Sequence, residues 1–219
     1  MNILFDVDGT LVQSYALDSR LFLQAVNDIV GEVRLRPDWH AYRHVTDQGI
    51  FADICADSGC SVDLVGAVRA RFADLIATHF ASDPAACPQV PGAGAMFAAL
   101  AARADVGLGL ATGGWGVTAA AKLAQAGIAY EPSWLFSSDI AHERVAIMRA
   151  CLAGVGRPSV PIVYVGDGEW DMTATAALGW DFIGVGERLR GKCPRWVADF
   201  RGPEFARHLD EISGGTLRL

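Results

Sequence analysis

Hydrophobic and polar positions divide the chain into three stretches with different periodicities. Residues 2–6 are apolar up to a final aspartate, which predicts a short buried strand. Residues 14–86 carry apolar side chains at helical spacing, and from residue 89 onward short apolar runs alternate with helical patterns. In this last stretch the pattern predicts strands at 106–111, 134–136, 162–165 and 182–185, and helices at 93–103, 117–125, 143–153 and 174–178.

The middle stretch is expected to be helical throughout. Its clearest helix spans 61–80, with Ser61 as a suitable N-cap and apolar side chains on one helical face. A second apolar stripe runs over 21–30, and two further helices are expected, one opened by Pro37 and one around 50–55. The stretch ends in a series of turn-forming residues, Pro84, Pro88, Pro91 and Gly92.

Strands that alternate with helices predict an α/β fold, in which helices cover both faces of a parallel sheet through right-handed crossovers. Because the helical stretch separates the first strand from the others, we interpret it as a cap inserted into the α/β core. The expected division is a core of residues 1–13 plus 89–219 and a helical cap of residues 14–88. Hinges are expected around residues 13–15 and 88–92.

Composition describes a folded acidic protein and argues against several classes of partner. Of the 219 residues, 52% are hydrophobic and 20% are charged, with a net charge of −7. This balance argues against a nucleic-acid partner, which usually selects a basic surface. No apolar segment reaches 18 residues, so no membrane partner is expected. Five scattered cysteines indicate reduced thiols, and in the absence of a visible signal peptide the expected location is cytoplasmic.

Three polar clusters follow predicted strands. Asp6 and Asp8 close the first strand, Thr112-Gly113-Gly114 follows the second, and residues 166–171 follow the fourth. The carboxyl ends of parallel strands share one edge of the sheet, where open α/β folds place their sites. The two aspartates point to the same side, and burying both without a cation would be unfavourable. This arrangement suits a site that binds a cation and reacts with a phosphate. A basic residue, Arg144, lies near the start of the helix between the last two clusters.

These four features, in this order, resemble the haloacid dehalogenase superfamily, in its phosphatase branch with a small helical cap. The likeness covers nearly the whole chain, is closest to phosphoglycolate phosphatases, and implies a Rossmann-like core. It makes Asp6 the nucleophile that forms an aspartyl-phosphate. Asp8 becomes the general acid for the leaving alcohol and then the base that activates water. By the same resemblance Thr112 and the Gly113 backbone bind phosphoryl oxygens, and Arg144 offsets charge there.

The resemblance also implies a magnesium site. Its oxygen ligands would be Asp6, the Asp8 carbonyl, Asp167 and Asp171, a donor set that suits Mg²⁺ over Zn²⁺.

Several positions depart from the family's usual pattern. Arg144 stands where lysine is usual, and Gln13 stands where aspartate is common. Trp115 and Trp170 are bulkier than usual, so we expect them to narrow the site or to pack against the cap. Poorer candidates for the basic residue are Arg188 and Arg207. We interpret Arg188, with Arg190 and Lys192, as part of a solvated loop.

Three cap residues, His44, Thr46 and Asp47, are similar to a segment that lies over the site in phosphoglycolate-phosphatase caps. The other interpretation is an ordinary helix N-cap, with Thr46 or Asp47 starting the helix from Gln48. The sequence leaves both open.

The sequence therefore predicts a Mg²⁺-dependent phosphatase that acts on a small phosphorylated metabolite. Within the superfamily, a phosphosugar mutase or a 5′-nucleotidase would use the same core residues. A catalytically silent binding module would keep the fold alone. A dehalogenase is disfavoured because Asp8 has no part in that reaction. A phosphonatase is disfavoured because both lysines, Lys122 and Lys192, lie outside the expected cap.

Overall fold

The sheet of the computed structural model has six parallel strands in the order β3-β2-β1-β4-β5-β6, and the structure describes residues 1–157 and 160–215. The strands are β1 (Asn2–Phe5), β2 (Gly107–Ala111), β3 (Leu135–Phe136), β4 (Ile162–Gly166), β5 (Asp181–Val185) and β6 (Trp196–Val197). Strand β1 is central, because its Phe5 pairs with Leu110 of β2 on one side and with Val165 of β4 on the other. The strand order reverses at β1, where folds of this kind form a crevice beyond the carboxyl ends.

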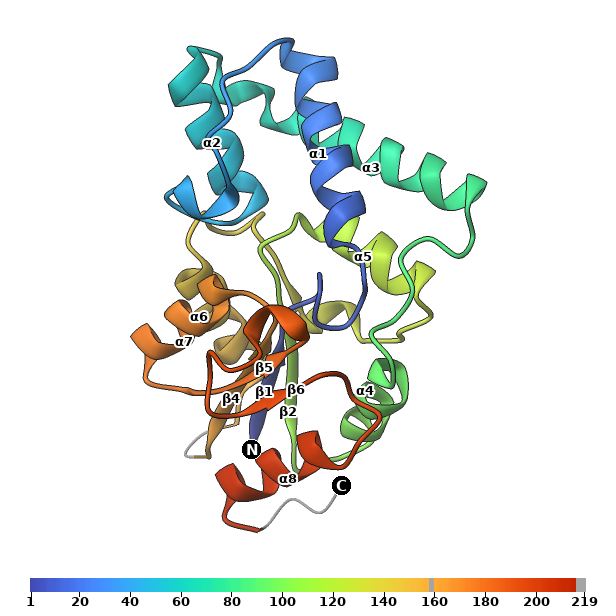
Figure 1. Cartoon of the computed structure of the whole chain (residues 1–219), viewed down its shortest axis with the longest axis vertical. Coiled ribbons are helices and arrows are strands. Elements are labelled where there is room, and N and C mark those ends of the chain that lie inside the picture. Colours follow the sequence, from blue (N-terminus) through green and yellow to red (C-terminus); the bar gives the residue numbers. More distant parts are fainter. Residues whose placement is uncertain (158–159, 216–219) are drawn as a thin grey trace.

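Helices cover both faces of this sheet (Figure 1). They are α4 (Ala93–Ala101), α5 (Gly116–Gln125), α6 (Arg144–Val155), α7 (Glu169–Leu178) and α8 (Glu204–Ser213). Side chains alternate along β1, so Phe5 packs with Phe97 of α4 and Phe205 of α8, at ring-centroid distances of 5.7 and 6.1 Å. On the opposite face, Leu4 belongs to a second buried cluster with Met148 of α6. The α/β fold predicted from the sequence is confirmed.

Three further helices, inserted between β1 and α4, lie beyond the carboxyl ends of the strands (Figure 1). They are α1 (Tyr15–Val30), α2 (Asp47–Ser58) and α3 (Val65–Ser82), and we refer to them as the inserted helices. The apolar faces of α1 and α3 pack together, with Phe22 and Phe72 5.8 Å apart in an edge-to-face arrangement. Thr46 caps α2, because its hydroxyl accepts the Gly49 N–H at 3.1 Å.

The chain enters and leaves the inserted helices through two segments that lie side by side. The Gln13 N–H donates to the Pro88 carbonyl at 2.8 Å, and the Val90 N–H donates to the Leu11 carbonyl at 2.9 Å. The bridge between Val12 and Gln89 is antiparallel. The proposed division at 13/14 and 88/89 falls within this paired connection and stays a prediction.

Two expected helices begin differently in the structure. The helix expected at 174–178 begins five residues earlier, at Glu169, because the Asp171 carboxylate accepts the Gly168 N–H at 3.0 Å and caps its first turn. Its first turn mixes Glu169 and Asp171 with Trp170 and Met172, so it shows no clear apolar spacing. The 61–80 pattern begins as a short 3₁₀ turn at Val62–Leu64, capped by Ser61, before α3 starts at Val65.

Other elements differ in extent or were not expected. Pro37 precedes only a 3₁₀ turn, Trp39–Ala41, and the Asp38 side chain caps it by accepting the Ala41 N–H. Strand β6 and helix α8 were not expected. The two residues of β6 are too few to show a period, and α8 buries only Phe205 and Leu209. No helix among the described residues is long and apolar enough to cross a membrane.

Candidate active site

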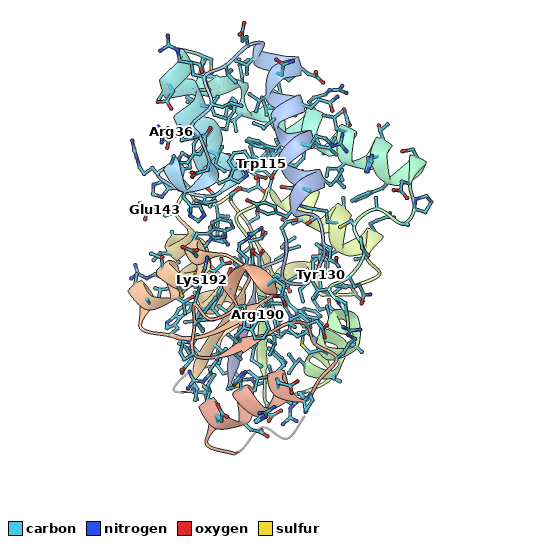
Figure 2. All side chains as sticks on the ribbon, in the orientation of Figure 1. Arg36, Trp115, Tyr130, Glu143, Arg190 and Lys192 are labelled. Atoms are coloured by element: carbon cyan, nitrogen blue, oxygen red, sulfur yellow. The ribbon has the colours of Figure 1, made fainter. Side chains whose placement is uncertain are left out.

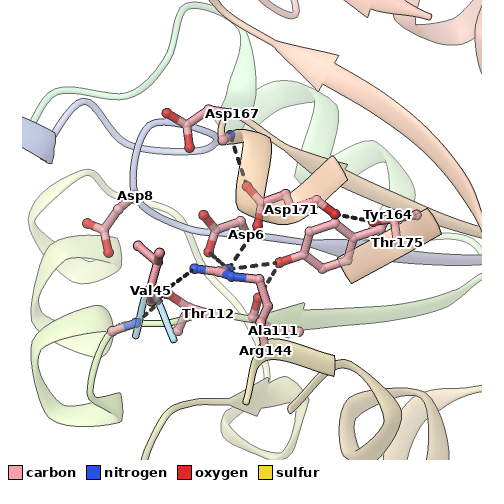
Figure 3. Close-up of polar contacts among 12 residues, drawn as sticks. Asp6, Asp8, Val45, Ala111, Thr112, Arg144, Tyr164, Asp167, Asp171 and Thr175 are labelled. Carbon is pink, nitrogen blue, oxygen red and sulfur yellow. Dashed lines mark hydrogen bonds and ion pairs between the residues drawn. The ribbon is translucent and has the colours of Figure 1, made fainter. Parts of the chain in front are cut away.

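Three buried carboxylates meet beyond the carboxyl ends of β1 and β4 (Figure 3). Asp6 follows β1, Asp167 follows β4, and Asp171 lies in the first turn of α7. One oxygen from each carboxylate lies within 4.8 Å of the other two, a spacing that a single ion can bridge. The turn after β1 needs glycine, because Gly9 has a φ of +79° and a side chain there would overlap Asp167. The structure thus brings together the three predicted metal-binding side chains.

The electrostatics of this acidic cluster fit a divalent cation. Burial and the neighbouring Asp171 raise the pKa of Asp6 well above its ordinary value, and the same two causes raise the pKa of Asp167 to about 7. Among the described residues, Asp167 Oδ1 is buried without a hydrogen-bond partner. A bound cation would supply the missing charge, and an all-oxygen donor set is the one that Mg²⁺ prefers. The residues present therefore fit a magnesium ion.

Arg144 reaches this cluster from the N-terminus of α6 (Figure 3). Its Nη1 lies 2.9 Å from Asp171 Oδ1 and 3.4 Å from Asp6 Oδ1, and its Nη2 donates to the Val45 carbonyl at 3.1 Å. Burial alone would lower the pKa of Arg144, but Asp171 and Asp6 raise it. Arg144 therefore places a permanent positive charge beside Asp6, as expected of the basic residue.

The Thr112-Gly113-Gly114 segment connects β2 to the start of α5 next to Asp6. The buried Thr112 hydroxyl accepts the Gly114 N–H at 3.1 Å, and the Gly113 carbonyl accepts the Asp47 N–H at 2.8 Å. A side chain at position 113 would overlap Arg144. Gly113 thus lets the backbone approach both the basic residue and the segment that leads into α2.

Asp8 lies apart from the three-carboxylate cluster. Lys122 Nζ is 2.6 Å from Asp8 Oδ1, and the Ser14 hydroxyl donates to the same carboxylate. The side chain of Asp8 is therefore held on the side of the site that faces the inserted helices. The metal role that the resemblance gave to its carbonyl stays a prediction.

Lys122, which sequence analysis did not select for the site, joins α5 to α1 through a buried ion pair. Its fully buried ammonium lies between Asp8 and Asp18, with 2.5 Å to Asp18 Oδ1. Burial alone would lower the pKa of Lys122, but Asp18 and Asp8 raise it, so the ammonium stays charged. The sequence did contain a signal for this pair, because Lys122 lies on the same apolar face of its helix as Ala119. A lysine on a buried face needs a charged partner.

One more residue at the site, Tyr164, was missed, and another, Arg188, was considered only as a poorer candidate for the basic residue. The Tyr164 hydroxyl of β4 donates to the Ala111 carbonyl at 2.6 Å and accepts from Arg144 at 3.4 Å (Figure 3). Arg188 Nη1 lies 3.1 Å from Asp167 Oδ2, and its guanidinium lies 4.0 Å from the Tyr15 ring centre. Interpreting the loop as solvated is therefore wrong for Arg188. The signal was its position, since it follows β5 at the edge where the other strands end.

The two bulky tryptophans pack against the inserted segment. Trp115 is fully buried where the inserted helices meet the sheet, with ring centroids 5.7 Å from Phe22 and 6.2 Å from Phe72 (Figure 2). Trp170 stacks on Tyr15 at 6.5 Å, with an interplanar angle of 9°. Of the two expectations, packing against the inserted segment is the one that both tryptophans fulfil.

A cavity of about 80 Å³ lies between the strand ends and the inserted helices. Its lining on the sheet side includes Asp6, Asp8, Thr112 and Arg144. Thr46 and Asp47 line it from the inserted segment, and Thr46 is also the α2 cap, so both interpretations of this segment apply. His44 lines a separate outer cavity instead.

A family model of haloacid dehalogenase-like hydrolases matches residues 1–179, and the chain belongs to this family. No curated protein sequence matches it.

Solved structures of low sequence identity share its fold. A hydrolase from Pseudomonas syringae is 19% identical with a TM-score of 0.72, over 97% of this chain and 99% of that one. CbbY from Rhodobacter sphaeroides, in complex with phosphate, is 21% identical with a TM-score of 0.70, over 92% and 95%. A putative phosphoglycolate phosphatase from Lactobacillus plantarum is 18% identical with a TM-score of 0.59, over 95% and 98%.

Proposed function

We propose that this hydrolase is a Mg²⁺-dependent phosphatase that cleaves a small phosphate monoester through an aspartyl-phosphate on Asp6. The observation that carries the proposal is the separation of two carboxylates in one cavity. Asp6 lies among acidic groups and Arg144, whereas Asp8 lies beside Lys122. Two carboxylates in different environments can divide the roles of nucleophile and acid–base.

In the first step, an Asp6 oxygen attacks phosphorus, the bond from phosphorus to the alcohol oxygen breaks, and Asp8 donates a proton to that oxygen. In the second step, Asp8 removes a proton from water, which attacks phosphorus and releases Asp6 and inorganic phosphate. When bound at Asp6, Asp167 and Asp171, Mg²⁺ would offset the negative charge of the phosphoryl group.

Other residues in the cavity orient the phosphoryl group in this proposal. The Thr112 hydroxyl and the backbone at Gly113 lie at the phosphoryl side, and Arg144 offsets the charge on its oxygens. Ser14 and Lys122 hold the Asp8 carboxylate toward the leaving alcohol.

In this proposal residues 14–88 act as a cap that closes over bound substrate and excludes water during the first step. Support comes from the cavity itself, to which the inserted segment contributes Thr46 and Asp47. Further support comes from the paired connections at Gln13–Pro88 and Leu11–Val90. This arrangement brings the two covalent connections of the segment to one place.

The direct test is turnover of p-nitrophenyl phosphate with Mg²⁺ and after removal of metal with EDTA. We expect turnover that EDTA abolishes and added Mg²⁺ restores. No turnover of any phosphate ester with Mg²⁺ present would refute the proposal and favour a binding module.

A second prediction concerns the basic residue. Arg144→Ala should lower kcat about 100-fold or more, because a preorganised charge beside the phosphoryl group is removed. Arg207→Ala is the matched control, since the Arg207 side chain is 59% exposed and pairs with Glu204 on α8. It should change kcat less than about twofold. Arg144→Lys keeps the charge and should retain more activity than Arg144→Ala. The reverse ranking of Arg144 and Arg207 would contradict the assignment.

A further inference from the structure

The inserted helices add aromatic and acidic walls to the cavity. Phe22 and Trp39 supply ring surfaces, while Asp18 and Asp47 supply carboxylates. Among the described residues that line the cavity, Arg144 is the one with a positive charge, and it is engaged by Asp6 and Asp171. The part of the cavity that would receive the leaving alcohol therefore presents no basic side chain.

Asp47 has one carboxylate oxygen available to a ligand. The residue is 8% exposed, and its Oδ2 accepts the Trp115 N–H at 2.8 Å. Among the described residues, Oδ1 forms no hydrogen bond. Burial and the nearby Asp18 raise the pKa of Asp47 well above its ordinary value. Asp47 is thus a buried acid that lines the cavity without a full set of partners.

Asp47 also lies close to where the substrate's ester oxygen would be. A methyl group built on Gly114 would be 3.4 Å from Asp8 Oδ2 and 3.8 Å from Asp47 Oδ2. Both carboxylates therefore border the same small space. An alcohol that takes its proton from Asp8 would extend past Asp47 toward the aromatic walls.

The charges in this region do not balance. Asp8 and Asp18 share the ammonium of Lys122. The same ammonium also acts to lower the pKa of Asp47. A ligand with a positive charge would offset the excess of carboxylates, and the faces of aromatic rings attract ammonium groups. A ligand with a second negative group would be repelled by the carboxylates.

We propose, on the basis of the phosphatase function above, that the substrate is the phosphate monoester of an amino alcohol. Its ammonium group, primary or quaternary, binds between Asp47 and the rings of Phe22 and Trp39. Hydrolysis then consumes one water, breaks the bond between phosphorus and the alcohol oxygen, and releases the amino alcohol and inorganic phosphate. Phosphoglycolate, whose carboxylate would face Asp47, is by this inference a poor substrate.

The test compares kcat/KM of the wild-type enzyme with Mg²⁺ for four monoesters. Phosphoethanolamine and phosphocholine carry the ammonium, 3,3-dimethylbutyl phosphate is the neutral isostere of phosphocholine, and phosphoglycolate carries a carboxylate. We expect the better of the two ammonium esters to exceed the isostere about 30-fold, and phosphoglycolate to be the poorest. The ranking of the two ammonium esters identifies which kind of ammonium binds.

Asp47→Asn tests the residue itself. Asparagine keeps an oxygen for the Trp115 N–H but removes the charge, so the ratio of ammonium ester to neutral isostere should fall to about threefold or less. Asp74→Asn, on the exposed face of α3, is the control and should keep the wild-type ratio. A second measurement uses the Asp6→Asn variant, which should bind esters without hydrolysing them and keeps Asp47. Calorimetry then compares the affinity of this variant for phosphocholine with its affinity for the isostere.

The outcomes separate this inference from the function on which it rests. Turnover of p-nitrophenyl phosphate together with equal or lower kcat/KM for the ammonium esters than for the isostere would overturn the inference and leave the phosphatase in place. Preference for phosphoglycolate would overturn it in the same way. Absence of turnover for every ester would overturn both.

Discussion

Asp6→Asn is expected to lower kcat for p-nitrophenyl phosphate by about 10,000-fold or more, while the protein stays folded. The amide has nearly the same shape as the carboxylate but cannot form the acyl phosphate. Loss of the fold is not expected, because burial and the neighbouring Asp171 raise the pKa of Asp6 and so oppose its ionised form. In the absence of metal the melting temperature should therefore stay the same or rise.

Steady-state rates and thermal melts of purified protein measure both parts of this prediction. Asp199→Asn is a suitable control, since Asp199 forms a surface ion pair with Arg201 at 2.6 Å, away from the cavity. It should leave kcat within about twofold of wild type. If Asp6→Asn retained a rate within tenfold of wild type, the covalent mechanism would have to be abandoned.

Lys122→Met is expected to lower the free energy of unfolding by about 3–5 kcal/mol at pH 8. The substitution leaves Asp8 and Asp18 buried without their shared ammonium, which lies within 2.6 Å of both carboxylates in the native protein. Breaking a buried ion pair from one side is strongly destabilising, because the remaining charge has neither water nor a partner. Urea denaturation at fixed pH measures the difference.

The pH dependence of this loss has a definite sign. Burial already raises the pKa of Asp18 to about 6 in the native protein, and removal of Lys122 raises it further. In the unfolded chain the same carboxyl has a pKa of about 3.9. Above that value the folded variant binds more protons than the unfolded chain, so its stability falls as the pH rises through the folded-state pKa. The effect of Lys122→Met should therefore be smaller at pH 5 than at pH 8.

Two comparisons make the Lys122 result specific. Lys192→Met removes the other lysine, an exposed partner of Glu169, and should change stability by less than about 1 kcal/mol. Asp18→Asn added to Lys122→Met should recover part of the lost stability, because it removes one of the stranded charges. Equal effects of the two lysine substitutions would contradict the buried ion pair.

Several residues of the site could be located from the sequence because their positions follow from strand ends. Asp6, Thr112 and Asp167 each follow a strand directly, and parallel strands bring their carboxyl ends to one edge. Asp171 lies in the first turn of α7 and Arg144 begins α6, but their roles came from the resemblance to the family's motifs and not from local periodicity. The short β6 was missed, because only its pairing with β5 defines it.

Lys122 could not be placed in the same way. Its partners, Asp8 and Asp18, are more than 100 residues away in the chain, and the contact depends on how the inserted helices pack on α5. Asp47 presents the same difficulty, since its carboxylate meets the Trp115 N–H from another part of the fold. Periodicity reports which face of a helix is buried, but it does not report which charges meet there.

The paired connections between Leu11–Gln13 and Pro88–Val90 restrict the cap motion proposed for residues 14–88. Two adjacent segments joined by backbone hydrogen bonds bend together, whereas sliding one past the other would break those bonds. Rotation of the inserted helices about the paired segments is the motion that preserves these hydrogen bonds. In the proposed cap motion, such a rotation would carry Asp18 away from Lys122, so opening would have to separate this buried ion pair.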